Sequence, residues 1–324
     1  MSTKQVGFIV IGRNEGRNLG DALQSLPADA SAVLYVDSGS TDDSVAVAIE
    51  KRISVHQLDP SAPFSAARAR KEGVARLLDA HPEVDFIQFL DGDCVLEPGW
   101  VEDAVGFLRR ESGIGVVCGL LVERCPEASV FNRFNAARWR VMPVGEINGS
   151  GGIFMASVDA YRTAGGFRSE LLTGEEMDFC NRLRGAGYRV VRIPVAMATH
   201  DSELLSFRDW WARAVWGGRG DALQFEVLGR LADRDQRREI RSVWIWAVVM
   251  PVLLVSGAVL SIWDGRFLLL CAAVLAGYAV VAARILRAQL RQGERWADAG
   301  IYSLLAVFRK LPYALGFLSY RRKY

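Results

Sequence analysis

The sequence contains few of the residues that build cross-links and metal clusters. Its 324 residues include five cysteines and three histidines. The cysteines show no paired spacing of the kind that zinc sites use, which argues against a structural zinc cluster. We expect all five to be free thiols, as in a reducing compartment; they are Cys94, Cys118, Cys125, Cys180 and Cys271.

We also expect no secretory leader and no internal repeats. Residues 1–5 lead into a short apolar run that stops at Arg13. This run is too short and too poorly flanked for a signal peptide. No repeat or low-complexity tract interrupts the chain. We expect one large domain that stays in the cytoplasm, followed by an appendage.

Hydrophobic residues make up 51% of the chain, and they concentrate in two stretches. Residues 244–263 are twenty residues without a charge, and residues 267–283 are seventeen more. A bilayer core needs roughly 20 apolar residues of helix. Because only the turn sequence Asp264-Gly265-Arg266 separates the two stretches, the pattern predicts a transmembrane helical hairpin. Two buried core helices are the alternative, but such helices usually keep a polar face.

Charge is divided unevenly along the chain. Residues 1–243 hold 29 Lys and Arg against 34 Asp and Glu, whereas residues 284–324 hold nine basic against two acidic residues. Arginines precede the first apolar stretch and follow the second. By the positive-inside rule both ends of the hairpin are cytoplasmic. The basic tail would also be attracted to anionic membrane lipid.

Two further segments are predicted to lie at the membrane surface. Residues 206–216 are rich in Trp and Arg, which suits a helix at the headgroup level, although a domain-closing helix fits equally well. Residues 301–320 are apolar but carry Arg309 and Lys310 at their centre, and a charge pair at mid-bilayer is costly. We expect an interfacial helix there and not a third span. The predicted organisation is a domain at 1–205, juxtamembrane helices at 206–243, the hairpin at 244–283 and a basic interfacial segment at 284–324.

Strands and helices alternate in the first hundred residues. Apolar, β-branched runs at 6–11, 32–36, 54–58 and 86–90 are separated by helical patterns at 18–26, 42–51 and 66–78. This alternation predicts an α/β domain with a mostly parallel sheet. Ligands of such sheets bind outside the carboxyl ends of the strands. We therefore expect Glu15, Asp37 and the triplet Asp91-Gly92-Asp93 to meet in one cleft.

The triplet Asp91-Gly92-Asp93 suits a hard divalent cation. Mg²⁺ typically uses one or two carboxylates, and phosphate oxygens complete its octahedron. A metal there would neutralise charge on a diphosphate leaving group. Such triplets also occur in plain turns, so alone this one predicts only a candidate metal site.

Five segments in the same order resemble those of family 2 glycosyltransferases with the GT-A fold, over most of residues 5–203. They are residues 10–15, residues 36–42, residues 69–73 (with Lys71 in place of the usual Asn), Asp91-Gly92-Asp93, and Gly174-Glu175-Glu176 with Asp178 and residues 182–184. The resemblance implies a Rossmann-like GT-A domain and inverting sugar transfer by in-line displacement.

The resemblance also implies roles for single residues on the donor side. Glu15 and Asp37 would contact the uracil and ribose of a nucleotide sugar, and Arg70 would lie near its diphosphate. Asp91 would lie near ribose or sugar, and Asp93 would bind a divalent metal, Mg²⁺ or Mn²⁺.

The same resemblance covers a late histidine and a glycine-rich segment. His200 ends a strand-like segment and would be a metal ligand or touch the diphosphate. His56 and His81 lack this context and are expected at the surface. Gly149-Ser150-Gly151-Gly152 resembles the acceptor-side segment where backbone approaches the sugar, with Gly151 and Gly152 against the donor. A simple loop before a strand is the alternative.

The acidic start of the predicted helix at 174–184 provides the candidate base. Inverting transfer to a hydroxyl needs a base opposite the leaving diphosphate, and a carboxylate within hydrogen-bond reach supplies it. Glu176 is the first candidate for this base and Glu175 is the second. The family usually has Asp where this chain has Glu176. The alternative is an acidic first turn that stabilises the helix dipole.

These observations predict a membrane-associated inverting glycosyltransferase. It would move one sugar from a UDP-type donor to a hydroxyl of a lipid-linked glycan in envelope or exopolysaccharide synthesis, at the bacterial inner membrane with its catalytic domain in the cytoplasm. We expect no nucleic-acid partner. Transfer to polyprenyl phosphate and a non-catalytic sugar-nucleotide-binding protein are the alternatives. A processive synthase is disfavoured because residues 213–219 do not match Gln-x-x-Arg-Trp.

Overall fold

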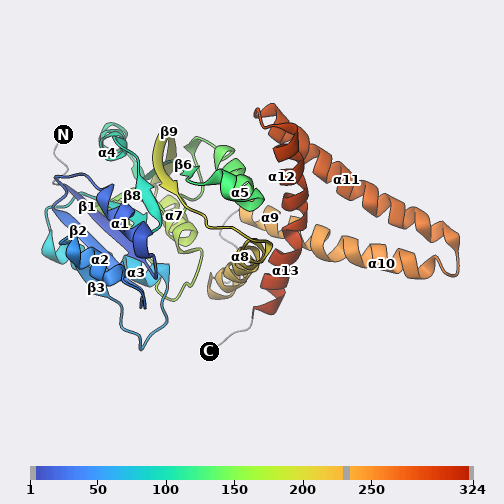
Figure 1. The fold of residues 1–324 in the computed structure, drawn as a ribbon, viewed down its shortest axis with the longest axis horizontal. Coiled ribbons are helices and arrows are strands. Elements are labelled where there is room, and N and C mark those ends of the chain that lie inside the picture. Colours follow the sequence, from blue (N-terminus) through green and yellow to red (C-terminus); the bar gives the residue numbers. More distant parts are fainter. Residues whose placement is uncertain (1–4, 229–233, 321–324) are drawn as a thin grey trace. The chain divides into compact units, whose positions relative to one another are not determined.

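The computed structural model describes residues 5–228 and 234–320 (Figure 1). The chain divides into two compact units, residues 1–124 with 142–202 and residues 125–141 with 203–324. Helix α5 (Val130–Arg140) falls within the segment expected to form the α/β domain, yet it packs in the second unit against α12 (Trp296–Phe308). An ion pair of 3.4 Å between Arg133 and Asp298 joins these two helices.

The first unit is built on a nine-stranded sheet. Its strands are β1 (Val6–Gly12), β2 (Ala32–Asp37), β3 (Ser54–Gln57), β4 (Phe86–Asp91), β5 (Cys94–Leu96), β6 (Ile114–Glu123), β7 (Gly145–Glu146), β8 (Phe154–Ser157) and β9 (Arg189–His200). Its α-helices are α1 (Gly16–Gln24), α2 (Ser44–Glu50), α3 (Ala66–Ala80), α4 (Trp100–Arg110), α6 (Val158–Thr163) and α7 (Glu175–Gly185).

The strands of the first hundred residues pair in parallel, as the sequence predicted, whereas the later part of the sheet is mixed. The strand order is β3-β2-β1-β4-β8-β6-β9-β5, with β7 beside β9. Strands β1 to β4 pair in parallel, whereas β8 runs antiparallel to β4 and β6, and β5 runs antiparallel to β9. The expected α/β class is therefore confirmed. The central parallel strand β1 is buried on both faces, and its Phe8, Ile9 and Val10 are fully buried.

The second unit consists of helices. They are α5, α8 (Phe207–Leu228), α9 (Arg234–Trp244), α10 (Met250–Leu260), α11 (Leu268–Arg291), α12 and α13 (Lys310–Ser319), with a π-helical turn at Ile245–Val249. Figure 1 shows α10 and α11 as two long neighbouring helices joined at one end, the predicted hairpin.

Among the described residues, three helices are long and apolar enough to cross a membrane, judged by length and composition: Arg237–Leu260, Gly265–Arg291 and Trp296–Ser319. The third covers the segment for which an interfacial helix was expected. It is less apolar than the other two, with a mean hydropathy of 1.3 against 2.3 and 2.2. It also divides into α12 and α13 at Arg309.

Helix α13 lies against α8 with their backbones in contact. A Cβ atom on Gly218 would collide with the carbonyl oxygen of Tyr313, and one on Gly316 would collide with the carbonyl oxygen of Val215. Small residues at helix crossings permit this approach. Tyr313 also donates a hydrogen bond to Asp221. The apolar C-terminal segment is thus fixed to a helix outside the predicted hairpin.

Replacing Gly316 by Ala should force α13 away from α8, because the added methyl group meets main-chain atoms that cannot move aside. We expect a loss of roughly 1–3 kcal/mol in the free energy of unfolding, measured as a lower melting temperature in detergent. Gly300→Ala is the matched control, since no atom lies within 4 Å of a Cβ there. Equal melting temperatures for the two variants would contradict the packing of α8 on α13.

Candidate active site

The loops that follow β1 and β2 are tied together by hydrogen bonds. Asn14 adopts a left-handed backbone conformation, with φ of 60°, and its N–H donates to Ser40 Oγ at 2.9 Å. Its side-chain Oδ1 accepts from the N–H of Thr41 at 2.7 Å. These contacts hold the loop that carries Glu15 against the loop that follows Asp37.

Asp37 ends β2 and is 2% exposed. Its carboxylate accepts hydrogen bonds from the backbone N–H groups of Gly39 (3.0 Å) and Ser40 (2.9 Å) and from Tyr35 Oη (3.0 Å). Burial, followed by the charge of Asp37, raises the pKa of Tyr35, so this phenol remains a donor. Asp37 therefore shapes its own loop, a role that the sequence pattern did not predict.

The side chain of Glu15 lies over two glycines at the ends of neighbouring strands. A Cβ on Gly12 would lie 2.7 Å from Glu15 Cγ, and one on Gly92 would lie 2.8 Å from the same atom. The middle residue of Asp91-Gly92-Asp93 must therefore be glycine for Glu15 to keep this position. The predicted meeting of Glu15 with the triplet is present in the structure.

A buried arginine joins three segments of the first unit. The side chain of Arg70 on α3 is 3% exposed. Its Nη2 donates to Asp91 Oδ1 at 2.8 Å and to the carbonyl of Gly152 at 3.1 Å, and its Nη1 forms an ion pair with Glu175. Burial alone would lower the pKa of Arg70, but Asp91 and then Glu175 raise it. The guanidinium thus stays charged inside the protein.

Gly152 lies directly against this arginine and its partner. A Cβ there would be 2.7 Å from Asp91 Oδ2 and 3.0 Å from Arg70 Nη2. Burial, and to a lesser degree the charge of Asp93, raises the pKa of Asp91 even though Arg70 opposes the shift. The carboxyl group of Asp91 is therefore fixed by its contact with Arg70 and is only partly free to bind a ligand.

The two glutamates at the start of α7 have different surroundings. Gly174 precedes them in a left-handed conformation, φ 72°, and Glu175 is 5% exposed in its ion pair with Arg70. Glu176 is partly exposed. Burial, and then the negative charge of Glu175, raises the pKa of Glu176 to about 8. This arrangement favours Glu176 over Glu175 as a base, because Glu175 is already engaged.

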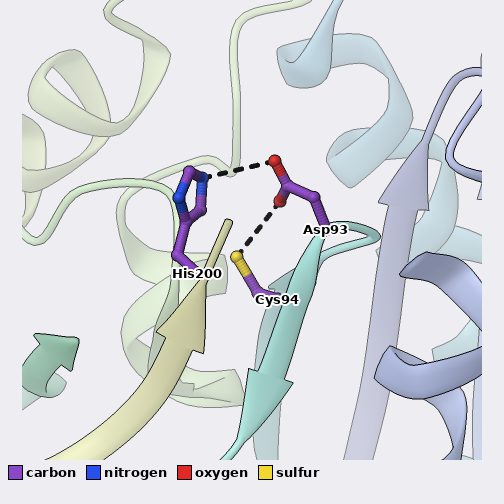
Figure 2. Close-up of side chains that lie close together, drawn as sticks. All are labelled: Asp93, Cys94 and His200. Carbon is purple, nitrogen blue, oxygen red and sulfur yellow. Dashed lines mark hydrogen bonds and ion pairs between the residues drawn. The ribbon is translucent and has the colours of Figure 1, made fainter. Parts of the chain in front are cut away.

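Asp93, Cys94 and His200 form a cluster whose geometry comes from strand pairing (Figure 2). Strand β5 runs antiparallel to β9 with Cys94 opposite His200. As a result His200 Nε2 lies 3.3 Å from Asp93 Oδ2, and Cys94 Sγ donates to Asp93 Oδ1 at 3.1 Å. Burial alone would raise the pKa of Asp93, but its hydrogen bond and charge contact with His200 lower it.

The donor set of this cluster fits a divalent metal of the Mn²⁺ or Mg²⁺ type. A carboxylate oxygen and an imidazole nitrogen, partly open to solvent, would hold the ion, and phosphate oxygens would complete its shell. Burial, followed by the charge of Asp93, raises the pKa of the Cys94 thiol well above its usual range. The thiol donates a hydrogen bond to Asp93, and its soft sulfur would suit such a hard ion poorly.

The glycine-rich segment faces α7. A Cβ on Gly149 would lie 2.7 Å from Met177 Cε, whereas Gly151 has a φ of 78° and open space around it. Ser150 is buried, with its Oγ 3.5 Å from Cys180 Sγ. The segment therefore approaches both α7 and, through Gly152, the buried Arg70.

Three further sequence predictions concern His56, Asp178 and the cysteines. His56, expected at the surface, is 9% exposed and lies 2.7 Å from Glu72, which also pairs with Arg68 on α3. Asp178 is buried and paired with Arg182 at 2.7 Å, which makes it a stabiliser of α7. All five cysteines are free, as expected.

The sequence is similar to known glycosyltransferases. Residues 8–165 match the model of Glycosyl transferase family 2. A pre-mycofactocin glycosyltransferase of Mycobacterium tuberculosis is 29% identical over 67% of this chain and 47% of its own length. An O-antigen chain rhamnosyltransferase of Salmonella typhimurium is 28% identical over 56% of this chain and 61% of its own. The chain thus spans about half of the first relative and three fifths of the second.

Solved structures share the fold. A mannosyltransferase from Pyrobaculum calidifontis, in complex with GDP-Man and Mn²⁺, superposes with a TM-score of 0.59 at 15% identity, over 98% of this chain and 88% of that one. Residues 1–349 of S. aureus TarS superpose with a TM-score of 0.51 at 16% identity, over 96% and 92%. Both likenesses concern the fold. Together with the family match over residues 8–165, they show that the chain carries a glycosyltransferase family 2 domain with the GT-A fold.

Proposed function

We propose that this glycosyltransferase moves one sugar, with inversion, from a nucleoside-diphosphate sugar to a hydroxyl of a lipid-linked glycan at a membrane surface. The proposal rests on the different contacts made by the two members of each acidic pair, Asp91/Asp93 and Glu175/Glu176. Arg70 neutralises Asp91 and Glu175, which leaves Asp93 beside His200 for a metal and Glu176 for proton transfer.

We place the binding site for the nucleotide-sugar donor at the residues around the ends of β1, β2 and β4. Glu15 and Asp37 would bind the base and ribose, and Arg70 and Asp91 would order the sugar end beside Gly151 and Gly152. A divalent metal bound by Asp93 and His200 would neutralise the diphosphate as it leaves. The family relatives that act on O-antigen chains support a carbohydrate acceptor of this kind.

The transfer itself forms one bond and breaks one. The acceptor hydroxyl oxygen attacks the anomeric carbon, the bond from that carbon to the diphosphate oxygen breaks, and the hydroxyl proton passes to Glu176. A base with a pKa near the working pH is effective in both accepting and releasing a proton. Asp93, on the metal side, stays ionised because His200 lowers its pKa.

The membrane part of the proposal rests on the apolar helices. Three of them could cross a membrane by length and composition. We propose a bacterial inner-membrane location with the catalytic unit in the cytoplasm, because arginines flank the predicted hairpin on both outer sides. An enzyme held at the surface meets a lipid-linked acceptor in two dimensions.

Substituting His200 by Gln should weaken metal use. We expect at least about a tenfold higher Mn²⁺ concentration for half-maximal nucleoside diphosphate release from a panel of nucleotide sugars, and Asp93→Asn should abolish the metal response. His81→Gln is the matched control, since that imidazole lies beside Glu83 away from the cluster. Unchanged Mn²⁺ titrations for both site variants would contradict the metal assignment.

Adding a methyl group at Gly152 should displace Asp91 and Arg70. Because misplacement of reacting groups by about 1 Å costs up to roughly 100-fold in rate, Gly152→Ala should lower kcat by that order with the fold intact by circular dichroism. Gly185→Ala, at the end of α7 with open space around its Cβ, serves as control. Full activity of Gly152→Ala would show that the contacts of Arg70 with Asp91 and Gly152 have no role in the reaction.

Glu176 must lose its proton before it can act as a base. Because its pKa is raised to about 8, kcat should rise with pH through that region and level off above it. Glu176→Gln should lower kcat by roughly 10²–10⁴-fold without weakening donor binding, whereas Glu170→Gln, an exposed neighbour, should not.

The same variant discriminates between acceptors. A phosphate acceptor is already anionic and requires no base. If Glu176→Gln kept full turnover with a flat pH profile, polyprenyl phosphate would become the better acceptor. Donor binding with no transfer to any lipid extract would instead favour a non-catalytic protein.

A further inference from the structure

Two strands of the first unit end side by side at His200. Strand β6 runs parallel to β9, and their pairing places Glu123, the last residue of β6, directly opposite His200, the last residue of β9. The N–H of Arg124 donates to the carbonyl of His200 at 2.9 Å. Ser202 follows two residues after His200 and contacts Glu123. The two strand ends therefore bring a carboxylate, a hydroxyl and an imidazole together.

Glu123 is a buried carboxylate that is bound by Ser202. Glu123 is 4% exposed and Ser202 is 6% exposed. The backbone N–H of Ser202 donates to Glu123 Oε1 at 3.1 Å, and its hydroxyl donates to Oε2 at 2.5 Å. Within residues 5–228 and 234–320, no arginine or lysine forms an ion pair with Glu123, and the neighbouring Arg124 pairs with Asp21 instead. A buried carboxylate needs such donors, because burying an uncompensated charge is costly.

The contact with Glu123 fixes the direction of the Ser202 hydroxyl. A hydroxyl has one hydrogen and two acceptor lone pairs, and the hydrogen of Ser202 is directed at the carboxylate, which is a strong acceptor. Ser202 Oγ also lies 3.5 Å from His200 Nδ1. Since only lone pairs of the oxygen remain, Nδ1 carries the hydrogen of this second contact. Hydrogen bonds in enzyme sites are often long before ligands bind and tighten afterwards.

A hydrogen on Nδ1 has a direct consequence for the other ring nitrogen. In a neutral imidazole it leaves the lone pair on Nε2. That nitrogen lies 3.3 Å from Asp93 Oδ2, within the candidate metal cluster (Figure 2). Histidines that bind metals almost always donate their second ring N–H to an acceptor such as a carboxylate, a carbonyl or water, which fixes the ring and its tautomer. Ser202, held by Glu123, is an acceptor of this kind.

We propose that Ser202 and Glu123 are positioning residues that act through His200. Glu123 orients the hydroxyl of Ser202, and this hydroxyl holds the imidazole with its Nε2 lone pair directed toward the metal site beside Asp93. This inference rests on the proposed function, because it takes His200 as a metal ligand. If the pair served only to close the turn after β9, its loss would lower stability without a selective loss of metal binding.

The test measures Mn²⁺ binding to the full chain in detergent, without nucleotide or turnover, from the electron paramagnetic resonance signal of free Mn²⁺. Ser202→Ala removes the acceptor oxygen. Glu123→Gln keeps the side-chain volume but offers an NH₂ group to Ser202 Oγ, which frees the hydroxyl hydrogen to turn toward His200. We expect each substitution to weaken Mn²⁺ binding by roughly tenfold or more. Because two different residues are changed, the test holds even if one variant fails to fold.

Thr199→Val is the matched control. It removes another hydroxyl that donates to a carboxylate, that of Glu97. Because side chains alternate along a strand, Thr199 lies on the face of β9 opposite to His200. We expect its Mn²⁺ binding to equal that of the unaltered chain. Melting temperatures from circular dichroism, measured for every variant, separate a loss of stability from a loss of metal binding.

A double-mutant cycle tests whether the two residues act through His200. In the His200→Gln background, neither Ser202→Ala nor Glu123→Gln should change the remaining Mn²⁺ binding by more than about twofold, because the ring that they position is gone. A further tenfold loss in that background would overturn the proposal. Unchanged Mn²⁺ binding of both single variants would overturn it as well.

Nucleoside diphosphate release from a panel of nucleotide sugars is measured on the same samples. If release depends on Mn²⁺ and on His200 while Ser202→Ala and Glu123→Gln bind Mn²⁺ normally, the positioning role is wrong and the proposed reaction stands. If Mn²⁺ binding follows the expected pattern while no donor is cleaved, the positioning role stands and the proposed reaction fails. If the unaltered chain binds no Mn²⁺, the metal assignment and the positioning role both fail.

Discussion

The candidate site depends on one buried positive charge. An arginine inside a protein must be neutralised, because removing its water is costly and an unpaired partner destabilises the fold strongly. Arg70 meets this requirement with Asp91 from β4, Glu175 from α7 and the carbonyl of Gly152. These groups come from three regions of the chain, so a single guanidinium holds the end of β4, the glycine-rich segment and the acidic helix α7 in one arrangement.

This arrangement gives chemically similar acids different properties. In each of the pairs Asp91/Asp93 and Glu175/Glu176, one member holds Arg70 and the other does not. Asp93 has its pKa lowered by His200, and Glu176 has its pKa raised to about 8. These different surroundings are the basis for proposing Asp93 as a metal ligand and Glu176 as the base.

Those parts of the fold and the site that depend on hydrophobic periodicity and on the residues at strand ends could be predicted from the sequence. The strands β1 to β4 and the meeting of Glu15 with the triplet follow from short apolar runs that end in polar residues. The contact of Asp93 with His200 rests on β5, which has three residues and pairs antiparallel with a strand about a hundred residues away, so only the family resemblance, and no local pattern, suggested that the two residues share a site. Likewise the buried His56 pairs with Glu72 on another element, and α5 joins the second unit through partners near the end of the chain.

The position of α5 has a consequence for the order of biosynthesis. Domains fold largely as their residues emerge from the ribosome, and most of the first unit is complete once residue 202 has been made. Helix α5 lies in the middle of that stretch, yet α12 and Asp298, with which it packs, are translated more than 150 residues later. Its arginine-bearing face must therefore stay without these partners while the apolar hairpin is synthesised, and the last helices of the chain complete a structure begun near its middle.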